Sequence, residues 1–144
     1  NAFAAVPLLV SFIPMLMDTG GNCGSQSSTL IIRGLALDEI KFKDIFRVIF
    51  KEFRIALLVG IGLAIANGIR IFIMYKDLKM AIVIALSLSL IVIIAKIIGC
   101  TLPLFAKKLH MDPAIMASPL ITTVVDTCSI MIYFSIATRV FTLS

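Results

Sequence analysis

The chain lacks several features on which soluble enzymes depend. It has no tryptophan, a single histidine and three cysteines in 144 residues. Cys23, Cys100 and Cys128 form no metal-ligand or disulfide pattern with each other or with His110, so we interpret them as small buried apolar residues. No phosphate-binding loop, serine-histidine-aspartate set or internal repeat is present. The sequence therefore predicts that the protein is not an enzyme, and no basic stripe with stacking aromatics indicates nucleic-acid binding.

Charge is also scarce, and apolar residues dominate. Charged residues make up 15% of the chain and hydrophobic residues 60%, with a mean hydropathy of +1.12. Soluble domains contain only roughly 45 to 50% apolar residues. We therefore predict an all-α, polytopic transmembrane helix bundle in a bilayer, with one domain over residues 1–144. The chain begins with Asn1 and enters an apolar run directly, so we expect a fragment of a longer protein rather than a signal peptide.

Four apolar runs are long enough to cross a membrane. They cover residues 2–37, 55–74, 80–105 and 113–134. The first is interrupted in its middle by a polar segment, residues 18–29, where we expect the span to be broken. The last begins after Asp112, a predicted N-cap with Pro113 at the first helical position.

Residues 38–54 combine charged and apolar side chains at helical spacing. This pattern predicts an interfacial amphipathic helix with Asp38 as its N-cap. We expect most of its charged side chains, a set that runs from Lys41 to Glu52, to be solvated. The net charge of the chain is +5, and the lysines and arginines lie mostly between the apolar runs. This placement predicts contact with anionic lipid headgroups and marks the amphipathic helix as cytoplasmic.

The polar segment 18–29 is dense in glycine, amide and hydroxyl groups. If it continues as a helix, one face carries Asn22, Gln26, Thr29 and Arg33. Its glycines would let a ligand or another helix approach the backbone closely. Two interpretations stay open: a ligand pathway, or close packing with amide hydrogen bonds between helices. Asp18 either joins this polar face or pairs with a base.

The last apolar run contains a carboxylate, Asp126. A charge at the bilayer centre costs about 2.5 to 3.5 kcal/mol on insertion scales, so such a residue indicates a functional site. Helical spacing places Thr122, Ser129 and Tyr133 on the same face of the helix as Asp126. Pro119 and Thr123 lie beside this polar face. The alternative is structural: the hydroxyls bond to their own helix, and Asp126 pairs with a base such as Lys96.

Depth decides whether the two polar faces can meet. Asp126 lies about 13 residues from Pro113, and Asn22 lies about 14 residues from Ala36 on a helix that runs the opposite way. At about 1.5 Å per residue, both lie roughly 20 Å from the same end of the bundle. We therefore expect the two polar faces to lie opposite each other.

Two stretches resemble the MgtE family of magnesium channels and transporters. They are PMLMDTGGNCGSQSSTLIIRGLALDEI, beginning at Pro14, and DPAIMASPLITTVVDTCSIMIYF, beginning at Asp112. The resemblance depends on a GGNxGxQ motif followed by RGLAL, and on TTxxD in the last helix. It extends over all 144 residues, including the amphipathic segment and the KKLxxDPA turn.

The resemblance implies a homodimer in a cell membrane, bacterial and multi-pass, with an ion pathway along its two-fold axis. The GGN-containing helix and the last helix of each subunit would line this pathway. Mg²⁺ would be the bound and transported ion, with Mn²⁺ or Co²⁺ as further candidates. Asp126 matches the family's ion-binding carboxylate, and Asp112 a carboxylate at the cytoplasmic mouth. The family's membrane domain has five spans, commonly preceded by cytosolic magnesium-sensing domains, and this chain shows four.

The chemistry of Mg²⁺ agrees with this implication. Mg²⁺ gives up water reluctantly, so a site needs one or two carboxylates and further oxygen groups that contact its hydration shell. Two Asp126 carboxylates would balance the ion, while Asn22 and Thr122 would bind its water. The expected pathway lining is Asp18, Gly20, Gly21, Asn22, Gln26, Pro119, Thr123 and Ser129.

Two alternatives to a magnesium pore follow from the same residues. A cation-coupled Mg²⁺ exporter would use Asp18 and Asp126. A structural membrane module would contain an Asp126–Lys96 pair.

Overall fold

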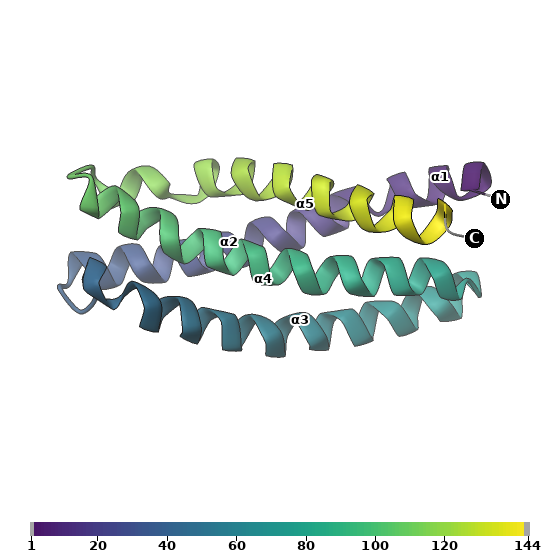
Figure 1. Ribbon diagram of the computed structural model, residues 1–144, viewed down its shortest axis with the longest axis horizontal. Coiled ribbons are helices and arrows are strands. Elements are labelled where there is room, and N and C mark those ends of the chain that lie inside the picture. Colours follow the sequence, from purple (N-terminus) through teal and green to yellow (C-terminus); the bar gives the residue numbers. More distant parts are fainter. Residues whose placement is uncertain (1, 143–144) are drawn as a thin grey trace.

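A computed structural model describes residues 2–142 and is helical along almost the whole of this range. The predicted all-α class is confirmed (Figure 1). The α-helices are α1 (Ala2–Ser11), α2 (Ile13–Ala36), α3 (Ile45–Tyr75), α4 (Leu78–Lys108) and α5 (Ser118–Thr142), and the short 3₁₀ helices are η1 (Phe42–Asp44) and η2 (Pro113–Met116). The α2–α3 and α4–α5 connections lie at one end of the bundle, and the α3–α4 connection lies at the other (Figure 1).

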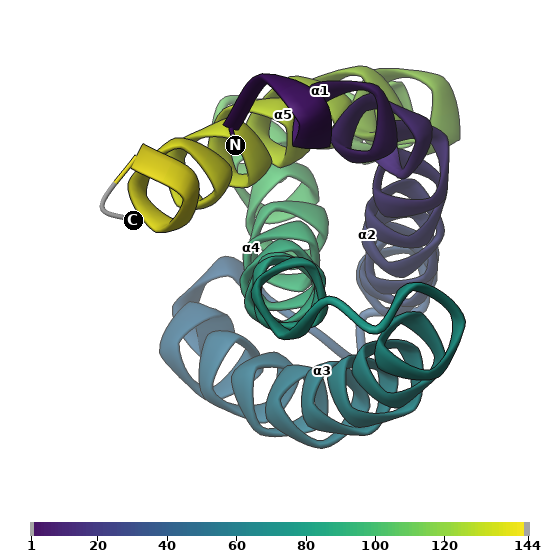
Figure 2. The ribbon, with the colours of Figure 1, turned by 90° about the vertical axis from the view of Figure 1, so that its right-hand side faces the viewer.

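Helix α4 forms the centre of the bundle. It packs against α2, α3 and α5, and the end view shows it surrounded by these three helices (Figure 2). Its sequence is apolar on nearly all sides, and the side that does not pack on the other helices carries exposed apolar side chains such as Ile82, Leu86 and Leu90, as expected of a membrane span. Val83, Ile84 and Val92 are fully buried. The helices that carry the polar faces, α2 and α5, pack on this apolar core and on each other.

Three of these segments are long and apolar enough to cross a membrane: Phe42–Tyr75, Leu78–Lys108 and Pro119–Thr142. The predicted polytopic helix bundle is therefore confirmed. Helix α2 has 24 residues, but its polar segment lowers its hydropathy, and α2 is absent from this set. The structure identifies α2 as a helix inside the bundle, and its role as a fourth span stays a prediction.

The predicted break inside the first apolar run is wrong. Residues 18–29 are continuous α-helix, and the helix is instead interrupted at Phe12, between the end of α1 and the start of α2. Pro14 lies in the first turn of α2, where its missing N–H group leaves no helical hydrogen bond unmade. The proline thus marks the start of α2, and the glycine-rich segment remains helical because it is packed inside the bundle.

The predicted amphipathic helix and the second apolar run form one helix, α3, instead of two elements. Asp38 is not its N-cap: it has φ 56° in the turn after α2, and η1 and α3 start at Phe42 and Ile45. Asp44 precedes α3, and its Oδ2 accepts a 3.0 Å hydrogen bond from the Lys41 backbone N–H. The pattern of residues 38–54 thus spans a turn and the first turns of a long helix.

The last predicted helix begins in two steps. Asp112 is an N-cap, because its Oδ1 accepts a 3.0 Å hydrogen bond from the Ala114 backbone N–H. It caps the short helix η2, and Ala117 then adopts an extended conformation before α5 begins. Pro119 lies in the first turn of α5, where proline is tolerated.

Candidate functional site between α2 and α5

The polar faces of α2 and α5 meet at a cavity of about 290 Å³. Its lining consists of Met17, Asp18, Gly21, Asn22, Thr122 and Asp126. The expectation that the two faces lie opposite each other is therefore confirmed. We refer to these six residues as the acidic cavity.

Two carboxylates line the acidic cavity, and no base does so among the described residues. A Cβ atom on Gly21 would lie 4.0 Å from Oδ1 of Asp126, so this carboxylate lies directly beside the α2 backbone. Asp18 accepts a 3.4 Å hydrogen bond from Nδ2 of Asn22. The carboxylate of Asp126 makes neither a hydrogen bond nor an ion pair with any part of the chain that the structure describes. Asp18 therefore belongs to the polar face of α2 instead of pairing with a base of the described chain.

A longer groove of about 640 Å³ continues from the acidic cavity along α2. It is lined by Asn22, Ser25, Gln26, Thr29, Leu30 and Thr122. Asn22 and Thr122 line both spaces, which makes them one polar surface along α2 and α5. Asn22, Gln26 and Thr29 are exposed in the single chain, as the shared helical face predicted. We refer to this surface, together with the acidic cavity, as the α2–α5 groove.

The hydroxyl groups on α5 bond to their own helix, as the structural interpretation predicted. Thr122 and Thr123 both donate to the carbonyl oxygen of Pro119, at 3.0 and 2.9 Å. Ser129 donates to the carbonyl oxygen of Val125 at 2.7 Å. Each hydroxyl oxygen keeps acceptor capacity for water, but only Thr122 lines the groove.

The polar stripe of α5 divides between the groove and the interior. Ser129 is buried against α2, where a Cβ atom on Gly20 would lie 2.9 Å from its hydroxyl oxygen. Tyr133 is buried and donates a 2.7 Å hydrogen bond to the carbonyl oxygen of Leu9. Gly20 and Ser129 therefore support the groove from the interior of the protomer, and Pro119 and Thr123 are exposed near its end.

Asp112 lies apart from the acidic cavity. It is exposed at the start of η2, where its side chain caps the helix. Ser28 of α2 donates a hydrogen bond to the carbonyl oxygen of Met116 and so ties η2 to α2. Asp112 itself lies between the end of α4 and the start of η2, in the connection that leads from α4 to α5.

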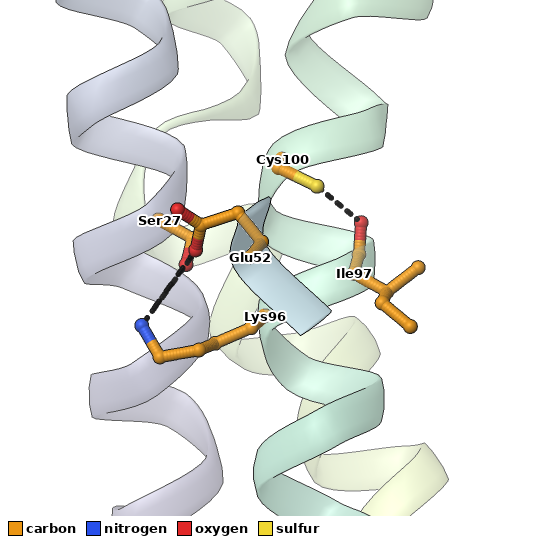
Figure 3. A network of polar contacts seen from close by, with 5 residues as sticks. All are labelled: Ser27, Glu52, Lys96, Ile97 and Cys100. Carbon is orange, nitrogen blue, oxygen red and sulfur yellow. Dashed lines mark hydrogen bonds and ion pairs between the residues drawn. The ribbon is translucent and has the colours of Figure 1, made fainter. Parts of the chain in front are cut away.

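Lys96 does not pair with Asp126, contrary to the structural alternative. Its Nζ lies 3.7 Å from Oε2 of Glu52 and 3.4 Å from the hydroxyl of Ser27, and Ser27 donates a 2.6 Å hydrogen bond to the same Glu52 oxygen (Figure 3). The three residues come from α2, α3 and α4 and are at most 6% exposed. Glu52 is therefore an exception to the expectation that most charged side chains of residues 38–54 are solvated. We refer to Ser27, Glu52 and Lys96 as the buried triad.

A spacing signal for the burial of Glu52 was present in the sequence. The buried residues of α3 include Val48, Glu52, Ala56, Gly60 and Ala64, which recur every four residues. Four-residue spacing places side chains on one face of a helix. The series crosses the predicted boundary between residues 38–54 and the apolar run 55–74. Its buried members Ala56, Gly60 and Ala64 lie in that apolar run, so the face is not apparent within residues 38–54 alone.

The buried triad holds the face of α2 that is turned away from the groove against α3 and α4, through the hydrogen bonds of Ser27. Ser27 follows Gln26 directly, so the triad holds one face of α2 while the adjacent polar face lines the groove. An ion pair in an apolar interior is stable only when its remaining hydrogen-bonding groups are satisfied. Ser27 supplies one of these bonds.

No group of three or more histidine, cysteine or acidic residues that could hold a metal ion occurs within residues 2–142. The α2–α5 groove therefore offers two carboxylates with amide and hydroxyl groups, and it is no closed cage of protein ligands. Such a donor set suits a cation that keeps most of its water. The fold and this groove define a polytopic helical membrane protein with an acidic, base-free polar surface.

Comparison with known proteins identifies the family. A family model described as MgtE, divalent cation transporter, matches residues 13–136. The chain belongs to this family of transporters. It is 40% identical over 138 residues to the magnesium transporter MgtE of Bacillus subtilis and 38% identical over 137 residues to that of Thermus thermophilus. These matches cover 96% and 95% of this chain but only 31% and 30% of the relatives, so the chain spans about a third of their length.

Proposed function

We propose that this chain forms part of a protein that transports Mg²⁺ across a cell membrane along the α2–α5 groove. The observation that carries the proposal is the acidic cavity, in which Asp18 and Asp126 lie together and no described lining residue is basic. A pair of carboxylates that no protein cation neutralises is suited to bind a metal cation. The relatives named magnesium transporters support Mg²⁺ as that cation.

The donor set supports a hydrated ion. Asp126 would interact with the charge of the ion, and Asn22, Gln26 and Thr122 would hydrogen-bond to its water. Asp112, exposed where α4 turns into α5, would attract cations toward the mouth of the pathway. Mn²⁺ and Co²⁺, which also accept oxygen ligands, serve as probes for the same site.

A second copy of the chain would complete the pathway. In a single chain the α2–α5 groove is an open surface that carries Asn22, Gln26 and Thr29. A polar surface at membrane depth requires a protein neighbour or water. A two-fold homodimer would place two such grooves opposite each other and enclose them between four helices, with one Asp126 from each subunit. A divalent ion crossing 100 mV releases about 4.6 kcal/mol, so transport needs no nucleotide.

The test measures Mg²⁺ flux into vesicles that contain the full protein. We expect Asp126→Asn to abolish flux while the protein remains inserted and folded. The matched control is Asp38→Asn, which removes an exposed carboxylate outside the groove; asparagine tolerates the positive φ of this position. Wild-type flux in the Asp126→Asn variant would refute the assignment of Asp126. An opposing Na⁺ or proton gradient that drives flux would instead indicate a coupled exporter.

A further inference from the structure

A second polar groove lies between the end of α2 and the beginning of α3. It has a volume of about 530 Å³. Three basic side chains line it, Arg33, Arg47 and Lys51, together with the acidic side chains of Glu39 and Glu52. Aliphatic side chains and Gly34 form the rest of its wall. We refer to it as the basic groove.

The charges of the basic groove do not cancel. Glu52 already interacts with Lys96 and Ser27 in the buried triad. Arg47 lies 3.3 Å from Asp44, but its side chain is 79% exposed. Arg33 and Lys51 are exposed, and neither side chain makes a hydrogen bond or an ion pair with a described residue. Among the described residues that line the groove, Glu39 is the one acidic side chain without an ion-pair partner. One free carboxylate cannot balance three basic side chains, so positive charge is in excess.

The position of the groove matches the boundary between water and lipid. Its α3 residues lie in the first two turns of a helix that can cross a membrane. On the same turns, the apolar side chains of Phe46 and Phe50 are 83% and 63% exposed. Apolar side chains so exposed beside basic ones are typical of a surface that contacts acyl chains and headgroups together. A free anion in water would contact only the basic part.

We propose that the basic groove binds the headgroup phosphate of an anionic phospholipid. Arg33 and Lys51, with Arg47 beside them, hold the phosphate, and the acyl chains lie against Phe46 and Phe50. Basic pockets between membrane helices are suited to such headgroups. Since Arg33 belongs to α2 and Lys51 to α3, the bound lipid bridges the helix that carries the α2–α5 groove and its neighbour. This inference is independent of cation binding at Asp126.

Native mass spectrometry of the full protein, released from detergent with added phosphatidylglycerol, tests the site. We expect Arg33→Gln/Lys51→Gln to weaken phosphatidylglycerol binding about thirtyfold, from about fivefold for each basic residue near an anionic surface. The matched control, Lys43→Gln/Lys107→Gln, removes two exposed basic residues outside the groove at the same end of the bundle and should change binding less than twofold. The charge-conserving variant Arg33→Lys/Lys51→Arg should bind phosphatidylglycerol as the wild type does. This result would show that the loss in the glutamine variant comes from the removed charges and not from misfolding.

Each other outcome counts against the proposal. Equal loss in the groove variant and the control would show that the lipid responds only to total charge. Equal binding of phosphatidylcholine, which is zwitterionic, would contradict a preference for anionic lipid. Displacement of phosphatidylglycerol by millimolar inorganic phosphate would show a site for free phosphate instead of a lipid.

Discussion

The hydroxyl of Ser27 donates a 2.6 Å hydrogen bond to Oε2 of Glu52, and this bond joins α2 to α3 across the central helix α4. Lys96 of α4 completes the contact at 3.7 Å from the same oxygen. The bond orients α2, because Ser27 can reach Glu52 only when the adjacent polar face is turned toward the α2–α5 groove. A buried polar contact of this kind can specify one helix arrangement among several that would bury similar apolar area.

Lys96→Met is expected to destabilise the bundle by about 3 kcal/mol or more, because Glu52 would remain buried without a counter-charge. Thermal unfolding in detergent measures the loss. The double variant Glu52→Gln/Lys96→Met should recover most of the stability, since neither side chain is then charged. Lys79→Met, at an exposed position of α4, serves as the control. A double variant no more stable than Lys96→Met alone would contradict this account.

Gly99→Ala is expected to destabilise the crossing of α2 and α4 by about 1 to 3 kcal/mol. A Cβ atom on Gly99 would collide with the backbone of Gly24, which cannot move without displacing α2. The control is Gly62→Ala, because no atom lies within 4 Å of the Cβ it would add. Thermal unfolding of both variants measures the difference, and equal stability of the two would show that this close approach is unimportant.

Asp18→Asn is expected to raise the half-saturating Mg²⁺ concentration about fivefold, with a smaller effect on maximal flux. Asp18 lines the acidic cavity with Asp126, and a second charge near the ion contributes about 1 kcal/mol at the dielectric constant of water. Flux into vesicles over a series of Mg²⁺ concentrations measures both quantities. An unchanged half-saturating concentration would remove Asp18 from the site.

Gln26→Cys is expected to allow covalent cross-linking of two copies in native membranes, if the α2–α5 grooves face each other in a homodimer. Gln26 is exposed and lines the groove. Replacing Cys128, the one native cysteine that is not buried, with alanine leaves the new thiol as the accessible one. Leu58→Cys, on an exposed face of α3, should remain monomeric. Cross-linking at Leu58 and not at Gln26 would place the subunit interface elsewhere.

The amino-acid sequence alone predicts the helical class, three apolar spans, the polar faces of α2 and α5 and the family to which the motifs belong. These features follow from local periodicity and composition, because helical geometry assigns each residue to a face whatever its neighbours are. The meeting of Asn22 with Asp126 was also predictable, since both depths could be counted from the helix ends.

The pairing of the buried polar residues depends on how the helices pack, and spacing along the sequence does not predict it. Lys96 had two possible acidic partners at reachable depth, and the rotation of α3 about its axis brings Glu52 to it and leaves Asp126 beside Asp18. That rotation depends on how α2, α3 and α5 pack around α4, including the close approach of Gly24 and Gly99. Sequence spacing fixes the residues on each helical face, whereas packing between helices fixes which faces meet.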